Sequence, residues 1–271
     1  ALQKIVGTQP QARIIVLNIE IALPKSSDDE RREEDGAGAA REVLYAEVER
    51  NAHLDSNFVV LLVLSTIVAA IGLIESNVAV IIGAMVIAPL LGPNLAFGMG
   101  TALGDPGLMR KATVSNGIGL VLAIGLSLIV GFTWPFDINS PELVARTNVG
   151  LDSVALALAS GAAAALSLTT GLSSVLVGVM VAVALLPPAV TLGLMLGFGS
   201  YEMAAGAGLL LAVNIVCVNL ASNIVFFVKG IRPRTWWEKK KANRATKIYA
   251  FIWVASLLLL MFVITGREAL Q

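Results

Sequence analysis

Six stretches of the chain contain no Asp, Glu, Lys or Arg, and this feature restricts the fold more than any other. They are residues 58–74, 76–104, 112–136, 153–201, 203–228 and 248–266. About 20 apolar residues at a rise of ~1.5 Å per residue cross the ~30 Å hydrocarbon core of a bilayer. The sequence therefore predicts an all-α polytopic membrane protein with seven transmembrane helices, at about 58–74, 77–103, 112–133, 153–170, 172–198, 204–228 and 248–265.

The composition excludes several classes of function. The chain is 56% hydrophobic and 14% charged, whereas soluble domains are about 45–50% apolar and about 25% charged. Its 19 cationic and 19 acidic residues cancel, so no basic field favours nucleic acid as a partner. The single cysteine, Cys217, excludes an internal disulfide, and the single histidine, His53, leaves little for zinc or triad chemistry. We expect no metal, no cofactor and no catalytic residues, and therefore no enzyme.

The distribution of cations predicts the orientation. Of the 19 Lys and Arg residues, 17 lie in segments that share one side of a seven-helix topology, and only Arg146 and Arg267 lie on the other side. Cytoplasmic loops carry the excess of Lys and Arg. We expect the inner (cytoplasmic) membrane, with the N-terminus in the cytoplasm and the C-terminus outside.

The regions outside the two central groups of helices are small. Residues 1–57 are predicted as a cytoplasmic region with a strand at 12–22, a charged linker at 25–38 and an amphipathic helix from Ala39 to about His53. Residues 229–247 are predicted as a basic cytoplasmic loop. Residues 248–271 are predicted as a peripheral seventh helix and an outer tail.

An internal repeat appears when the chain is shifted by 95 residues. Residues 83–93 (GAMVIAPLLGP) then align with 178–188 (GVMVAVALLPP), with six of eleven positions identical. We therefore predict two three-helix units, at 58–133 and 153–228. Because three is odd, the second unit enters the membrane from the opposite side, which makes an inverted repeat of the kind that builds many transporters. Duplication kept only for packing is the alternative.

Prolines interrupt the middle helix of each unit. A proline removes one backbone donor and clashes with the carbonyl four residues earlier, and in lipid such carbonyls must be covered by protein or face water. We therefore expect both helices to break against a shared interior, and a simple kink is the alternative. The candidate pathway residues are Pro89, Gly92, Pro93, Asn94, Pro187, Pro188 and Asn214.

The polarity of this interior predicts the solute class. The second halves of the two broken helices are expected to begin near Asn94 and Ala189, and helix N-termini favour an anion or a neutral polar solute. The first halves are expected to end there with free carbonyls, which can hold a dehydrated cation, so a cation stays an alternative. The spans contain no charged side chain, which favours passive conduction over proton-driven transport. Most intramembrane asparagines are expected to join helices by hydrogen bonds.

The segments 72–77 (GLIESN), 83–93 and 184–188 (ALLPP), together with Arg146, Thr147 and Asn214, resemble the domain-of-unknown-function family numbered 389, which comprises hydrophobic bacterial and archaeal membrane proteins. The resemblance covers roughly residues 40–230. It implies an integral membrane protein, often with a soluble N-terminal region, but it does not indicate what the protein does.

We expect a channel or facilitative transporter for a small ion or polar solute, leaning anion or neutral, with the lipid bilayer and other copies of the chain as partners. The alternative is a non-transporting scaffold or accessory protein.

Overall fold

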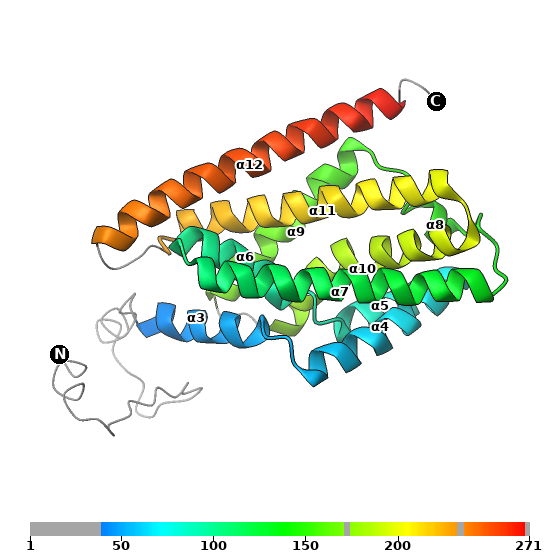
Figure 1. The fold of residues 1–271 in the computed structure, drawn as a ribbon, viewed down its shortest axis with the longest axis horizontal. Coiled ribbons are helices and arrows are strands. Elements are labelled where there is room, and N and C mark those ends of the chain that lie inside the picture. Colours follow the sequence, from blue (N-terminus) through cyan, green and yellow to red (C-terminus); the bar gives the residue numbers. More distant parts are fainter. Residues whose placement is uncertain (1–38, 171–173, 232–235, 269–271) are drawn as a thin grey trace. The chain divides into compact units, whose positions relative to one another are not determined.

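The structure is a computed structural model that describes residues 39–170, 174–231 and 236–268. The described residues form helices joined by short connections, and a helix lies at each of the seven predicted positions (Figure 1). The helices are α3 (Ala39–Asn51), α4 (Ser56–Ile74), α5 (Val78–Ile87), α6 (Leu91–Leu103), α7 (Pro106–Thr133), α8 (Pro141–Val144), α9 (Leu151–Thr170), α10 (Ser174–Phe198), α11 (Tyr201–Val228) and α12 (Trp236–Glu268).

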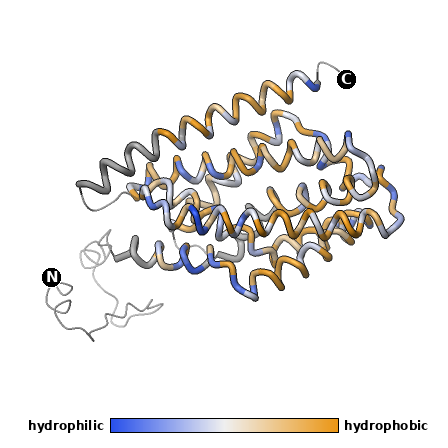
Figure 2. The backbone as a smooth tube through the Cα atoms, in the orientation of Figure 1, coloured by the Kyte–Doolittle hydropathy of each residue, from blue (hydrophilic) through white to orange (hydrophobic). Residues whose placement is uncertain are grey.

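Four helices, α4, α7, α9 and α11, are long and apolar enough to cross a membrane, and the bent pair α5 and α6 adds a fifth candidate span. Figure 2 shows apolar residues along the bodies of the helices and hydrophilic residues gathered toward their ends. The chain is therefore a helical membrane protein with four to five candidate spans. Seven spans stay a prediction, because only shorter apolar segments of α10 and α12 are described, Leu185–Phe198 and Phe251–Arg267.

The chain divides between Ala46 and Glu47 into two units, and the second unit contains every helix from α4 onward. Side-chain caps begin several of these helices. Asp55 accepts a hydrogen bond from the Phe58 N–H at the start of α4, and Asp105 accepts two from the Gly107 and Leu108 N–H groups at the start of α7. Such caps satisfy donors that have no partner within a helix. The predicted amphipathic helix is present as α3, whereas the predicted strand and linker lie outside the described residues.

The helix boundaries repeat with the same 95-residue shift as the sequence. Adding 95 to the ends of α4 gives 151–169, against 151–170 for α9, and adding 95 to α7 gives 201–228, the range of α11. The range of α5 and α6 together, 78–103, becomes 173–198, against 174–198 for α10. Gly104 and Gly199, which end the middle helices, have φ of 67° and 89°, and glycine adopts this left-handed conformation most easily.

The two three-helix groups contact each other through their second and third helices. Gly98 on α6 lies against Ser222 on α11, and a Cβ built on Gly98 would be 3.1 Å from Ser222 Cβ. Gly193 on α10 lies against Ser127 on α7 in the same way, with a separation of 2.6 Å. Each residue of the second pair is the 95-residue counterpart of one in the first, so the two contacts are reciprocal.

These contacts also give the helix directions. Along α6 and α11, Asn94 contacts Asn219 and Gly98 contacts Ser222, so the two helices are parallel. In contrast, α6 and α7 are antiparallel, because Asn94 contacts Asn116 whereas Gly100 lies against Met109. It follows that α7 and α11 run in opposite directions (Figure 1).

The predicted break at Pro187 and Pro188 is wrong, because α10 continues through both prolines. In the 95-residue alignment Pro188 corresponds to Pro93 and Pro187 corresponds to Gly92. Pro93 lies in the first turn of α6, where a missing N–H does not break the helix. The residue that breaks the first unit, Pro89, corresponds to Ala184. The shared proline is therefore not the one that interrupts the helix. Both prolines of α10 are buried, and the helix packs extensively against α7.

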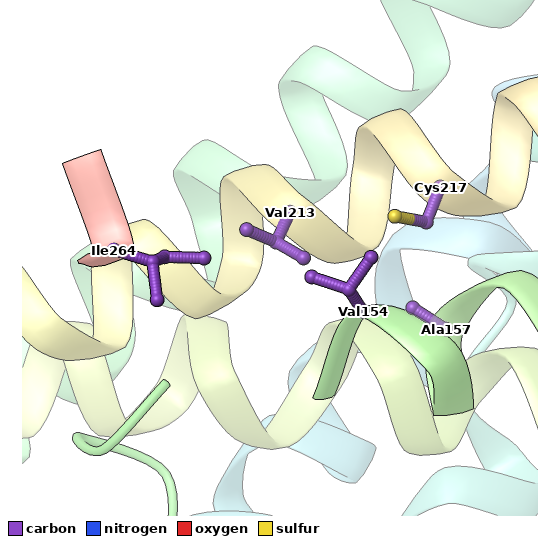
Figure 3. Packing of buried hydrophobic residues seen from close by; sticks show 5 residues of the cluster. All are labelled: Val154, Ala157, Val213, Cys217 and Ile264. Atoms are coloured by element: carbon purple, nitrogen blue, oxygen red, sulfur yellow. The ribbon is translucent and has the colours of Figure 1, made fainter. Parts of the chain in front are cut away.

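The last helix begins earlier than predicted. α12 starts at Trp236, so twelve residues assigned to the basic loop are helical, and Lys and Arg are good helix formers. Near its other end Ile264 is 1% exposed and joins a cluster with Val154 and Ala157 of α9 and Val213 and Cys217 of α11 (Figure 3). Phe251, Leu259 and Phe262 on α12 are exposed, which leaves one apolar face of the helix uncovered by the rest of the chain that the structure describes.

Candidate functional site

The candidate site lies where α5 and α6 meet. α5 ends at Ile87, α6 begins at Leu91, and their axes differ by 54°. Ala88 between them is extended, with φ −66° and ψ 124°. A residue before proline avoids the helical region, and Pro89 offers no N–H to the Met85 carbonyl. Pro89 therefore accounts for the break in both respects.

Asn94 is the polar side chain at this break. It is 1% exposed and lies in the second turn of α6. Its Nδ2 donates to the Leu90 carbonyl oxygen at 2.9 Å and to Asn116 Oδ1 on α7 at 3.1 Å. Its Oδ1 accepts a longer hydrogen bond, 3.4 Å, from Asn219 Nδ2 on α11. One amide thus links the break to both third helices.

Some buried polar atoms in and near this group of asparagines have no hydrogen-bond partner among the described residues. Among the residues that the structure describes, no hydrogen-bond partner lies near the buried Asn219 Oδ1 or Asn223 Nδ2. The two residues are four apart on α11, so they share one helix face. The Thr191 hydroxyl on α10 is also buried without a partner. A buried polar group without a partner costs about 1–3 kcal/mol. The interior of the bundle therefore contains both a free acceptor and free donors.

The predicted site residues are distributed unevenly around the break. Pro89 and Gly92 are half-buried and Pro93 is buried, and all three lie at the break or in the first turn of α6. Pro187 and Pro188 are buried inside the unbroken α10. Asn214 is buried on α11, five residues before Asn219, and five residues turn a helix by about 140° beyond a full turn. Asn214 thus faces a different direction from Asn219.

The sequence did not single out Asn116 and Asn219 as site residues. Both were visible as polar residues in apolar helices, but α7 and α11 are apolar on every side, so no periodic pattern shows which face points inward. A spacing of four residues between Asn219 and Asn223 was the available signal.

The buried polar side chains of the described residues are Ser, Thr and Asn, and none carries a charge. Within the described ranges no group of three His, Cys, Asp or Glu side chains lies close enough to hold a metal ion. The arrangement can therefore exchange hydrogen bonds with a solute.

Comparison with known proteins identifies the family. The family model described as "Domain of unknown function (DUF389)" matches residues 85–220, which include the break, Asn94, Asn116 and Asn219. The chain belongs to this family. It is also 35% identical over 252 residues to "Uncharacterized protein MJ0678" of Methanocaldococcus jannaschii, a match that covers 93% of this chain and 78% of the relative. No solved structure matches the chain.

Proposed function

We propose that this DUF389 protein is a membrane channel or facilitative transporter for a small polar solute or ion, with its pathway along the α5–α6 break. The observation that carries the proposal is the buried Asn94, which joins the break to Asn116 and Asn219 while Asn219 Oδ1 stays unpaired. A scaffold has no need for unpaired polar atoms beside a broken helix, whereas a passing solute can satisfy them in turn.

Two inverted three-helix repeats form the framework in this proposal. The reciprocal contacts, Gly98 with Ser222 and Gly193 with Ser127, are those that a two-fold axis between the repeats produces. The opposite directions of α7 and α11 support an axis that inverts one repeat relative to the other. Solute sites in inverted-repeat transporters lie near the bilayer midplane at the interface between repeats.

The break has the position that such a site needs. α5 has ten residues and α6 has thirteen, which corresponds to about 15 Å and about 20 Å of helix on either side. In a hydrocarbon core of about 30 Å the break falls near the middle. In this proposal the Asn94 network lies where water is scarcest and a polar pathway is most needed.

The chemistry of the site favours a neutral or anionic solute. The N-terminus of α6 has no side-chain cap, and a free helix N-terminus favours negative or neutral groups. Because α10 is unbroken, a second N-terminus does not face it, so the attraction for an anion is weaker than two broken helices would provide. Free acceptors and donors together suit a neutral solute that has both kinds of group.

Flux through purified protein in liposomes tests the proposal. We expect Asn94→Leu to lower the flux of the transported solute at least tenfold, because Leu at 94 cannot bond to Asn116 or Asn219. The screen includes chloride, potassium, urea and glycerol. Asn139→Leu, the same change at an exposed position outside the spans, serves as the control and is expected to conduct normally. Absence of flux for every solute from folded protein would favour a scaffold.

We further propose seven spans in the inner membrane, with the N-terminus in the cytoplasm and the C-terminus outside, in a homo-oligomer. Support for this orientation comes from the 17 Lys and Arg residues that lie on one side of a seven-helix topology, because cytoplasmic loops carry the excess of Lys and Arg. A reporter enzyme that is active only outside the cytoplasm should be active when fused after Gln271 and inactive when fused after Gly230. Activity of the reporter fused after Gly230 would show that the orientation is the reverse of the proposed one. Cross-linking in membranes tests the oligomer.

A further inference from the structure

A cavity of about 450 Å³ lies where the chain enters α4 and where α7 begins. Two exposed cations on α7, Arg110 and Lys111, line it together with His53, and Leu54 and Val114 contribute apolar wall. Ser115 and Ala52 also line it, and the buried Ser115 hydroxyl donates to the Ala52 carbonyl oxygen at 2.8 Å. We call this the cationic cavity.

The carboxylates near the cationic cavity leave Arg110 available. Glu49 pairs with Lys111 at 2.6 Å. Asp55 and Asp105 accept hydrogen bonds from backbone N–H groups at the starts of α4 and α7. Among the described residues Arg110 has no ion-pair partner, so its guanidinium can bind a ligand.

The second three-helix group provides an internal comparison. A cavity of about 390 Å³ lies at the equivalent place, lined by Thr147, Asn148 and Val149, the 95-residue counterparts of Ala52, His53 and Leu54. Leu209, the counterpart of Val114, also lines it. The counterparts of Arg110 and Lys111, however, are Ala205 and Gly206. The cation that lines the second cavity, Arg267, comes from α12 instead. Packing at this junction therefore does not require cations on the third helix of the group, and Arg110 and Lys111 need another explanation.

We propose that the cationic cavity binds a phosphate group. A guanidinium presents paired donors that match phosphate oxygens, and a lysine ammonium adds a second charge. The group can belong to the headgroup of an anionic lipid, since basic pockets between helices at the membrane surface bind such headgroups, or to free phosphate. The apolar wall formed by Leu54 and Val114, which are 37% and 47% exposed, suits the glycerol end of a lipid.

Binding to the purified full chain in detergent micelles tests the site, with short-chain phosphatidic acid, short-chain phosphatidylcholine and inorganic phosphate as probes in calorimetry. We expect phosphatidic acid to bind more tightly than phosphatidylcholine. Arg110→Ala should weaken it about fivefold, the contribution of one cation near a lipid surface. Lys111→Ala should weaken it less, because Lys111 is already paired with Glu49, and the double variant should lose at least fivefold. If inorganic phosphate binds as tightly as phosphatidic acid, the ligand is free phosphate; if the lipid alone binds, it is the headgroup.

Arg267→Ala is the matched control, because Arg267 is the cation that lines the second cavity. It should bind phosphatidic acid like the unchanged protein. The proposal is overturned if the Arg110 and Lys111 variants bind normally, if Arg267→Ala weakens binding equally, or if neither phosphatidic acid nor phosphate binds. Both substituted side chains are exposed, and the exposed Lys111–Glu49 pair contributes little to stability, so circular dichroism should show normal folding.

Discussion

Pro89→Ala is expected to straighten the α5–α6 pair and to lower solute flux at least tenfold. Alanine restores the N–H that the Met85 carbonyl lacks and frees Ala88 to become helical. Joining the two helices changes the rotation of α6 about its axis relative to α5. Because Asn94 has to reach Asn116 and Asn219 at 3.1 and 3.4 Å, a small rotation of α6 separates these amides.

Spin labels at Val80 and Leu103 measure the change directly. Removing a 54° bend between helices of about 15 Å and about 20 Å lengthens the distance between their outer ends by about 4 Å. The native Cys217 is buried, so labelling at the two introduced cysteines is selective. Pro93→Ala is the matched control, because Pro93 lies in the first turn of α6, where a missing N–H costs little. An unchanged distance and unchanged flux in Pro89→Ala would show that Pro89 does not cause the break.

The helices could be predicted from the sequence because lipid imposes one strong requirement. An uncharged apolar stretch must satisfy its backbone internally, and a helix does so. The predicted 58–74 and 204–228 accordingly match α4 and α11 within three residues. The start of α12 could not be placed, because most of its first twelve residues are polar, and a helix end outside an apolar stretch leaves no hydropathy signal.

The candidate site was only partly predictable. Asn94 could be recognised from its place beside two prolines. The alignment at the 95-residue shift, however, pairs Pro93 with Pro188 and so predicted the same break in both helices. What distinguishes them is Pro89, which breaks the helix and makes Pro93 a first-turn residue of α6. The second unit has Ala184 at the equivalent position, so Pro188 stays inside a continuous helix. Arg110 and His53 are 57 residues apart in sequence, and only the turn between α3 and α4 brings them to one cavity.

The packing of the unbroken α10 against α7 predicts a large loss of stability when Gly131 is replaced. A Cβ built on Gly131 of α7 would overlap the Leu194 carbonyl oxygen and lie 2.9 Å from Leu194 Cα. Backbone atoms cannot rotate away as a side chain can, so Gly131→Ala must push the two helices apart. Because α10 lacks two backbone donors at Pro187 and Pro188, this close contact supplies stability that its own hydrogen bonds do not.

We therefore expect Gly131→Ala to lose about 3 kcal/mol of stability, at the upper end of the cost of overpacking. Gly125→Ala on the same helix is the control. A Cβ at Gly125 meets nothing within 4 Å, so that change should be neutral or should gain up to about 1 kcal/mol from helix propensity. The fraction of monodisperse protein that survives heating in detergent measures both. Equal survival of the two variants would mean that α7 and α10 are not in backbone contact, and the packing that stabilises the continuous α10 would need a different source.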